Sequence, residues 1–111
     1  MPWTIESALE NELIQNQRKL LSEYKFELGE IPVEITIRMY QQLKGNKVEF
    51  TQSHFIHTPK QAGPYKTSIP IKDYEAEALH QVVSAFSNYY SQAVSAGCKP
   101  SPSWLIKNEE F

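Results

Sequence analysis

Residues 31–39 constrain the fold most, because an apolar side chain occupies every second position of Ile-Pro-Val-Glu-Ile-Thr-Ile-Arg-Met. A period of two is typical of a strand with one buried face and one solvated face. Pro32 fits the start or an edge of such a strand, since it has no N–H to donate. The side chains expected to face the core are Ile35, Ile37 and Met39. Those expected to face outward are Glu34, Thr36, Arg38 and Tyr40.

Helical patterns flank this region on both sides. Thr4 is suited to an N-cap, and apolar residues then recur at helical spacing, which predicts a helix from about Thr4 to about Tyr24. Asp73, followed by acidic residues that favour a helix N-terminus, opens a second and broader apolar stripe. Gly97 is expected to end this second helix, and Pro100 prevents its continuation.

The segment between the two helical patterns predicts further strands. Residues 44–47, Lys-Gly-Asn-Lys, form a hairpin turn, because glycine and asparagine tolerate positive φ. The second strand is expected over residues 47–57, with a bulge near Ser53, and a third over residues 65–71, confined to an edge by Pro70. The predicted fold is α+β: helix, three-stranded antiparallel meander, helix (α-β-β-β-α), with both helices on one face of the sheet.

The length of 111 residues predicts a single domain over residues 1–111, with an extended C-terminal tail at 98–111. Hydrophobic residues make up 41% of the chain and thus provide enough material for a core. No apolar run approaches the roughly 20 residues of a membrane span, and the N-terminus lacks the pattern of a signal peptide. No membrane partner is therefore expected. The lone Cys98 cannot form an internal disulfide, so a cytoplasmic location is expected.

The sequence carries no recognisable catalytic pattern. His54 and His57 lie three residues apart, but on a strand such side chains point to opposite faces, which argues against a metal site. The four glycines are too scattered to cradle a phosphate. We therefore predict no catalytic residue, no cofactor and no metal ligand, and an enzyme is the less favoured class.

Charge is distributed unevenly along the chain. Residues 1–34 hold seven acidic and three basic side chains, residues 35–72 one acidic and six basic, and residues 73–111 five acidic and two basic. The net charges are −4, +5 and −3, so the predicted sheet is basic between acidic helices. Basic groups interleaved with aromatic rings can bind phosphates and bases. The favoured explanation is nevertheless that the helical and sheet segments neutralise each other within the domain. The candidate partner surface consists of Arg38, Tyr40, Lys44, Lys47, Lys60, Tyr65, Lys66 and Trp104.

Trp104 belongs to an apolar run, Trp-Leu-Ile, that either packs on its own domain or anchors a partner. The first hypothesis for function is a small cytoplasmic, non-enzymatic protein-interaction domain, of adaptor or regulatory type. Its partner would be a protein, and a homodimer is expected, because two helices on one sheet face leave the other face open. The alternative is a nucleic-acid or ribosome-associated binding module that uses the basic strand face and loops.

Overall fold

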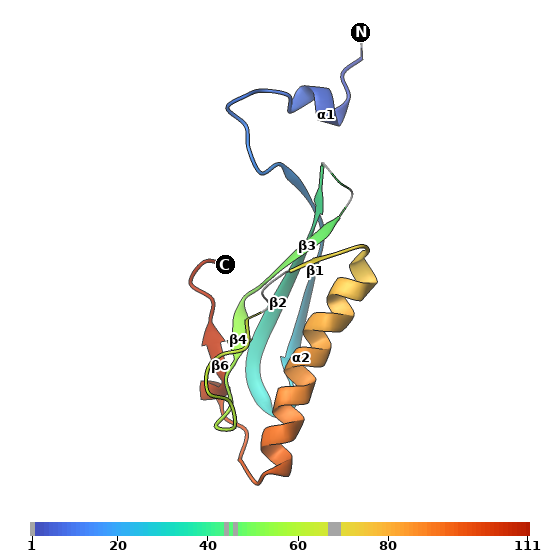
Figure 1. Ribbon diagram of the computed structural model, residues 1–111. Helices are drawn as coiled ribbons and strands as arrows, with labels where there is room; N and C mark the ends of the chain where they lie inside the picture. Colours follow the sequence, from blue (N-terminus) through green and yellow to red (C-terminus); the bar gives the residue numbers. More distant parts are fainter. Residues whose placement is uncertain (1, 44, 46, 67–69) are drawn as a thin grey trace.

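The computed structural model describes residues 2–43, 45, 47–66 and 70–111. One long helix lies against an antiparallel sheet, and a second, two-stranded sheet stands beside it (Figure 1). The larger sheet has the order β1-β2-β3-β5 and the smaller one pairs β4 with β6. The strands are β1 (Arg18–Leu28), β2 (Ile31–Gln42), β3 (Val48–Gln52), β4 (His54–Ile56), β5 (Ile71–Lys72) and β6 (Leu105–Lys107). The helices are α1 (Ile5–Ala8), α2 (Glu75–Ser95) and the 3-10 turn η1 (Pro102–Trp104).

The core lies between α2 and one face of the larger sheet. The inward positions predicted for residues 31–39 are confirmed: Ile35, Ile37 and Met39 are fully buried, and Arg38, predicted outward, is half-buried. The outward position predicted for Thr36 does not leave it exposed, because it is 7% exposed and its N–H donates to the Ser53 hydroxyl. α2 contributes Phe86, which is 1% exposed and meets the ring of Phe26 on β1 edge-on at 6.0 Å between centroids. The remaining buried apolar residues of this core are Leu28, Ile31, Val48, Phe50, Ile56, Ala78, Val82, Ala93, Trp104 and Leu105.

The helix predicted from Thr4 to Tyr24 is wrong, and with it the helix-first α-β-β-β-α fold. Helical structure in this region is limited to α1, and residues 18–28 form β1, which pairs antiparallel with β2. The reason is a bulge: the register shifts between Leu20 and Ser22, so Leu21 is an extra residue. The bulge breaks the period of two and leaves Leu20, Leu21 and Tyr24 at a spacing that imitates a helix. Of the described elements, α2 is the only helix that covers the sheet, so the expectation of two helices on one face is also wrong.

The meander differs from the predicted one as well. The second strand is interrupted at Ser53, near the expected bulge, because the Ser53 hydroxyl and not its carbonyl accepts from the Thr36 N–H. The Ser53 carbonyl accepts instead from the N–H of Asn108 in the tail. Beyond Ser53 the chain leaves the larger sheet and pairs as β4 with β6 of the C-terminal tail. A third strand was predicted over residues 65–71, but strand pairing with β3 begins only at Ile71. Residues 67–69 of that prediction lie outside the described residues. In the predicted hairpin turn, Gly45 has a φ of 93°, and residues 44 and 46 lie outside the described residues.

α2 matches the second predicted helix, except at its cap. The N-cap is Tyr74 rather than Asp73, and no side chain caps the helix there. Asp73 instead binds Lys47. At the other end, the N–H of Gly97, at φ 90°, donates to the carbonyl of Val94 and closes the helix as expected.

Residues 2–17 form an N-terminal arm that extends from the sheet, with α1 at a distance from α2 (Figure 1). The molecule is accordingly elongated, with extents of 64 × 24 × 23 Å. The single turn of α1 is held by reciprocal bonds: Ser7 N–H donates to the Thr4 hydroxyl at 3.0 Å, and Thr4 N–H donates to the Ser7 hydroxyl oxygen at 2.9 Å. The arm therefore has local order without lying on the core.

Candidate partner surface

Two of the candidate residues, Arg38 and Tyr40, lie side by side along β2 on the sheet face opposite α2. This face assignment follows from the burial of their neighbours on β2, and it agrees with the outward positions predicted from the sequence. Arg38 is opposite Glu23 on β1, and its Nε donates to that carboxylate at 2.8 Å. The ring of Phe111, from the end of the chain, lies 4.3 Å from the Arg38 guanidinium carbon. Both the charge and the flat face of Arg38 are thus already engaged within the chain.

The ion pair between Arg38 and Glu23 sets the titration of both groups. The hydrogen bond from Arg38 lowers the pKa of Glu23 below its ordinary value, and the same bond raises the pKa of Arg38. Tyr40 is engaged in a similar way, because the guanidinium carbon of Arg18 lies 4.1 Å from the centre of its ring. Arg38 is therefore not a free cation for a phosphate, and the Tyr40 ring is already covered by Arg18.

The loop residues of the candidate surface lie elsewhere. Lys47, just before β3, binds Asp73, which precedes α2. Lys60 is exposed in the segment after β4, and the Nζ of Lys66 lies 5.2 Å from the ring centre of Phe55. Tyr65 packs against Tyr89 of α2, with ring centroids 5.2 Å apart. Lys44 lies outside the described residues.

Trp104 is part of the core rather than of any surface. It is 3% exposed and packs edge-on against Tyr90 of α2, at 5.7 Å between ring centroids. β6 follows at once and pairs with β4, so the tail folds back on its own chain. The described members of the candidate set therefore divide among the outer sheet face, the segments that flank β3 and β4, and the core, and they do not form one continuous surface.

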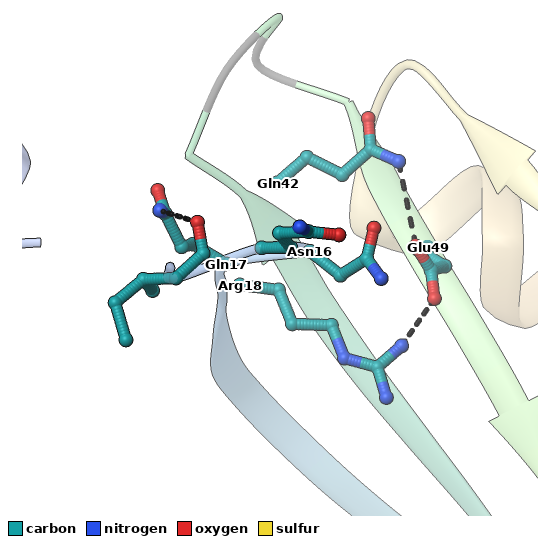
Figure 2. Close-up of a pocket in the computed structure, with 7 residues that line it drawn as sticks. Asn16, Gln17, Arg18, Gln42 and Glu49 are labelled. Carbon is teal, nitrogen blue, oxygen red and sulfur yellow. Dashed lines mark hydrogen bonds and ion pairs between the residues drawn. The ribbon is translucent and has the colours of Figure 1, made fainter. Parts of the chain in front are cut away.

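A hollow lies where the arm meets the sheet. It has a volume of about 750 Å³ and is shown in Figure 2. Arg18 is bound there to Glu49, whose second oxygen accepts from the Gln42 amide at 3.3 Å. Asn16 gives the arm its bend through a positive φ of 56°. The hollow is lined by Ile14, Gln15, Asn16, Gln17, Arg18, Gln42 and Glu49. Its charged groups neutralise one another, so it offers polar contacts rather than an activated acid, base or nucleophile.

The histidines have separate partners. His54 lies 2.8 Å from the hydroxyl of Ser53 through Nδ1, and His57 lies 3.2 Å from the carbonyl of Gln61 through Nε2. Burial lowers the pKa of His54, and the nearby charge of Lys107 lowers it further. Within the described ranges, no group of three or more His, Cys, Asp or Glu side chains is placed to hold a metal ion, and no helix is long and apolar enough to cross a membrane.

Sequence reasoning missed the arm as a surface, because its apolar residues were assigned to a packed helix. In the structure, Trp3, Ile5 and Leu13 are 81%, 69% and 82% exposed. The available signal was the polar run Asn11–Glu12 and Gln15–Gln17, which interrupts the apolar stripe.

Comparison of the chain with models of protein families, with curated proteins and with solved structures finds no match.

Proposed function

We propose that this protein is a small cytoplasmic, non-enzymatic protein-interaction domain of adaptor or regulatory type. It binds a protein partner through its N-terminal arm and associates with itself as a homodimer. The observation that carries the proposal is the exposure of Trp3, Ile5 and Leu13 on a segment that stands away from the core.

Large apolar side chains on a projecting segment favour a protein partner for energetic reasons. Burial of apolar surface contributes about 25 cal/mol per Å², and the arm obtains little of it within its own chain. Tryptophan is also among the residues that dominate binding energy when they enter a partner's pocket. The turn of α1 is fixed by Thr4 and Ser7 before binding, so less conformational entropy is lost when the arm docks.

The nucleic-acid alternative has weaker support. Lys47 and Arg38 are bound to carboxylates of the same chain, and Arg38 is also packed under Phe111. A phosphate would have to displace these partners before it could be bound. We therefore keep RNA binding as an outcome of the test and not as a second proposal.

The test compares the wild-type chain with an arm variant, Trp3→Ala with Leu13→Ala, in quantitative affinity capture from the source cells. Tyr74→Ala serves as the matched control, since Tyr74 is 59% exposed but lies outside the arm. We expect one protein to be captured by the wild type and the control and lost with the arm variant. Its purified form should then bind the wild-type chain directly.

Identical capture by all three chains would contradict the role of the arm. RNA retention at about 50 mM salt that decreases steeply as salt is raised would instead support the nucleic-acid alternative. Light scattering tests the self-association separately, since a monomer has a mass of 12.8 kDa.

A further inference from the structure

β1 presents a free sheet edge. It is the outermost strand of the β1-β2-β3-β5 sheet, and it is 11 residues long. Its ladder partners all lie on β2, and no backbone hydrogen bond joins it to any other described segment. Such an edge presents a row of unpaired N–H and C=O groups that can add another strand.

We infer that the strand added to this edge is β1 of a second copy. The two β1 strands run antiparallel, and the two-fold axis lies between Tyr24 of one copy and Tyr24 of the other. The two sheets then continue into one of eight strands, with both copies of α2 on the same face. This inference rests on the self-association in the proposed function and specifies its interface. An isologous contact of this kind requires the edge to be complementary to itself.

The regular part of β1 limits the possible registers. The ladder with β2 is irregular at Leu21 and again between Glu27 and Leu28, so a regular edge extends only over residues 22–27. A symmetric ladder of five residues within that stretch covers either residues 22–26, centred on Tyr24, or residues 23–27, centred on Lys25. A more distant axis would bring a bulged or turn residue into the new ladder.

Charge decides between these two registers. With the axis at Tyr24, Glu23 of each copy is opposite Lys25 of the other, which gives two pairs of opposite charge. With the axis at Lys25, the two lysines are opposite each other, and Glu23 is opposite Glu27. Opposite charges at directly facing positions stabilise a strand pair, and like charges destabilise it. Within one chain the Nζ of Lys25 already lies 3.4 Å from the Glu34 carboxylate and 3.6 Å from that of Glu23, so in this register each lysine would be shared between its own chain and the facing Glu23 of the copy.

The flank of α2 above β1 is apolar. Val83 and Val94 lie on it and are 38% and 42% exposed. The opposite flank carries Glu77 and Ser84, which line a hollow together with Lys72 of β5, at the far edge of the sheet. The exposed valines are therefore on the side of α2 that would approach a copy joined through β1.

The hydroxyls of Ser22 and Tyr24 both contact Glu75, the first residue of α2, and the ring of Phe26 packs against Phe86. Tyr24 is therefore level with the start of α2 and not with Val83. The valine flank agrees with a copy joined through β1, and the facing charges alone distinguish the two registers.

Disulfide trapping tests the register. In a Cys98→Ser background, Tyr24→Cys should form a disulfide-linked dimer in nearly all chains on mild oxidation. Directly opposite residues have Cα atoms about 4.5–5.5 Å apart, within the range of a disulfide. The matched control is Glu23→Cys, whose copies lie diagonally across the axis and should stay unlinked. A mixture of Glu23→Cys and Lys25→Cys chains should link to each other.

Charge reversal tests the interface without a cross-link. Lys25→Glu turns both attractive pairs into repulsive ones and should raise the dimer dissociation constant about ten-fold or more. Lys19→Glu makes the same change of charge on the same strand but outside the ladder, and should change the constant less than about two-fold. Circular dichroism confirms that each variant is folded.

The outcomes separate the two proposals. A wild-type chain that remains at 12.8 kDa at about 100 μM would overturn both this inference and the proposed self-association. A dimer in which Tyr24→Cys does not cross-link, or that responds equally to Lys25→Glu and Lys19→Glu, would overturn the β1 interface alone.

Discussion

Gly29→Ala should destabilise the fold far more than an ordinary glycine substitution. Gly29 lies in the turn between β1 and β2 and has a φ of 55°, a backbone conformation that residues other than glycine rarely adopt. A Cβ built there would overlap Cζ and the hydroxyl oxygen of Tyr90 on α2. That hydroxyl accepts a hydrogen bond from the N–H of Glu30 at 3.1 Å, and its ring packs against Trp104 at 5.7 Å.

The size of the effect follows from these contacts. The left-handed backbone costs roughly 1–2 kcal/mol for alanine. Displacing Tyr90 would add about 1 kcal/mol for its hydrogen bond and about 0.5–1.5 kcal/mol for its aromatic pair. We therefore expect Gly29→Ala to lower the free energy of unfolding by about 3–4 kcal/mol. Gly97→Ala has the same backbone term at φ 90° but meets open space, so about 1–2 kcal/mol is expected.

Urea unfolding of both variants measures this difference, provided that the slope of the unfolding free energy against urea concentration, the m value, stays the same. A double-mutant cycle with Tyr90→Ala adds a sharper comparison, because without the ring Gly29→Ala should cost no more than Gly97→Ala. Equal losses for Gly29→Ala and Gly97→Ala in the wild-type background would show that Tyr90 moves aside freely. The contact would then have no role in fixing the turn.

Three further outcomes are expected. Phe86→Ala should cost about 3–5 kcal/mol in urea unfolding, because the side chain is 1% exposed, and a loss below about 1 kcal/mol would contradict its place in the core. Trp104→Ala should cost a similar amount, whereas Trp3→Ala should change stability by less than about 0.5 kcal/mol, and equal effects would refute the contrast in burial. The folded-state pKa of His54 lies below the value of 6.5 for an unperturbed histidine, so the unfolded chain binds the proton first. Stability should therefore fall as pH decreases below about 6.5, and His54→Gln should flatten this part of the profile of free energy against pH.

The parts of the fold that could be predicted are those with an unbroken period. Residues 31–39 alternate without interruption, and their buried set was correctly assigned to the face that α2 covers. α2 was predictable for the same reason, since its apolar stripe runs to Gly97 without a break. In both segments α2 and the sheet bury each other's apolar side, so the buried apolar residues follow the backbone period. Thr36 is the exception on β2, since it is buried on the other face of the sheet beside Ser53.

β1 could not be predicted in this way, because its period is broken where the strand is bulged. From Ser22 onward the strand alternates, and Tyr24 and Phe26 point toward α2. Before the bulge, Leu20 and Leu21 are adjacent and exposed, and they give no strand signal. The free edge of β1 was hidden by the same error, although it is the surface that we infer to join two copies.

The uneven charge of the chain illustrates why a tally by segment cannot locate a partner surface. Arg38, from the basic middle segment, binds Glu23 of the acidic first segment, and Lys47 binds Asp73 of the acidic last segment. Antiparallel pairing and the return of the chain into α2 bring these segments together, so part of the positive charge is neutralised within the fold. Exposed pairs of this kind add little stability, but they do occupy the cations that a phosphate would need. Among the described residues, the fold also leaves large apolar side chains exposed on the arm and backbone groups unpaired along β1, and both kinds of surface are suited to binding protein.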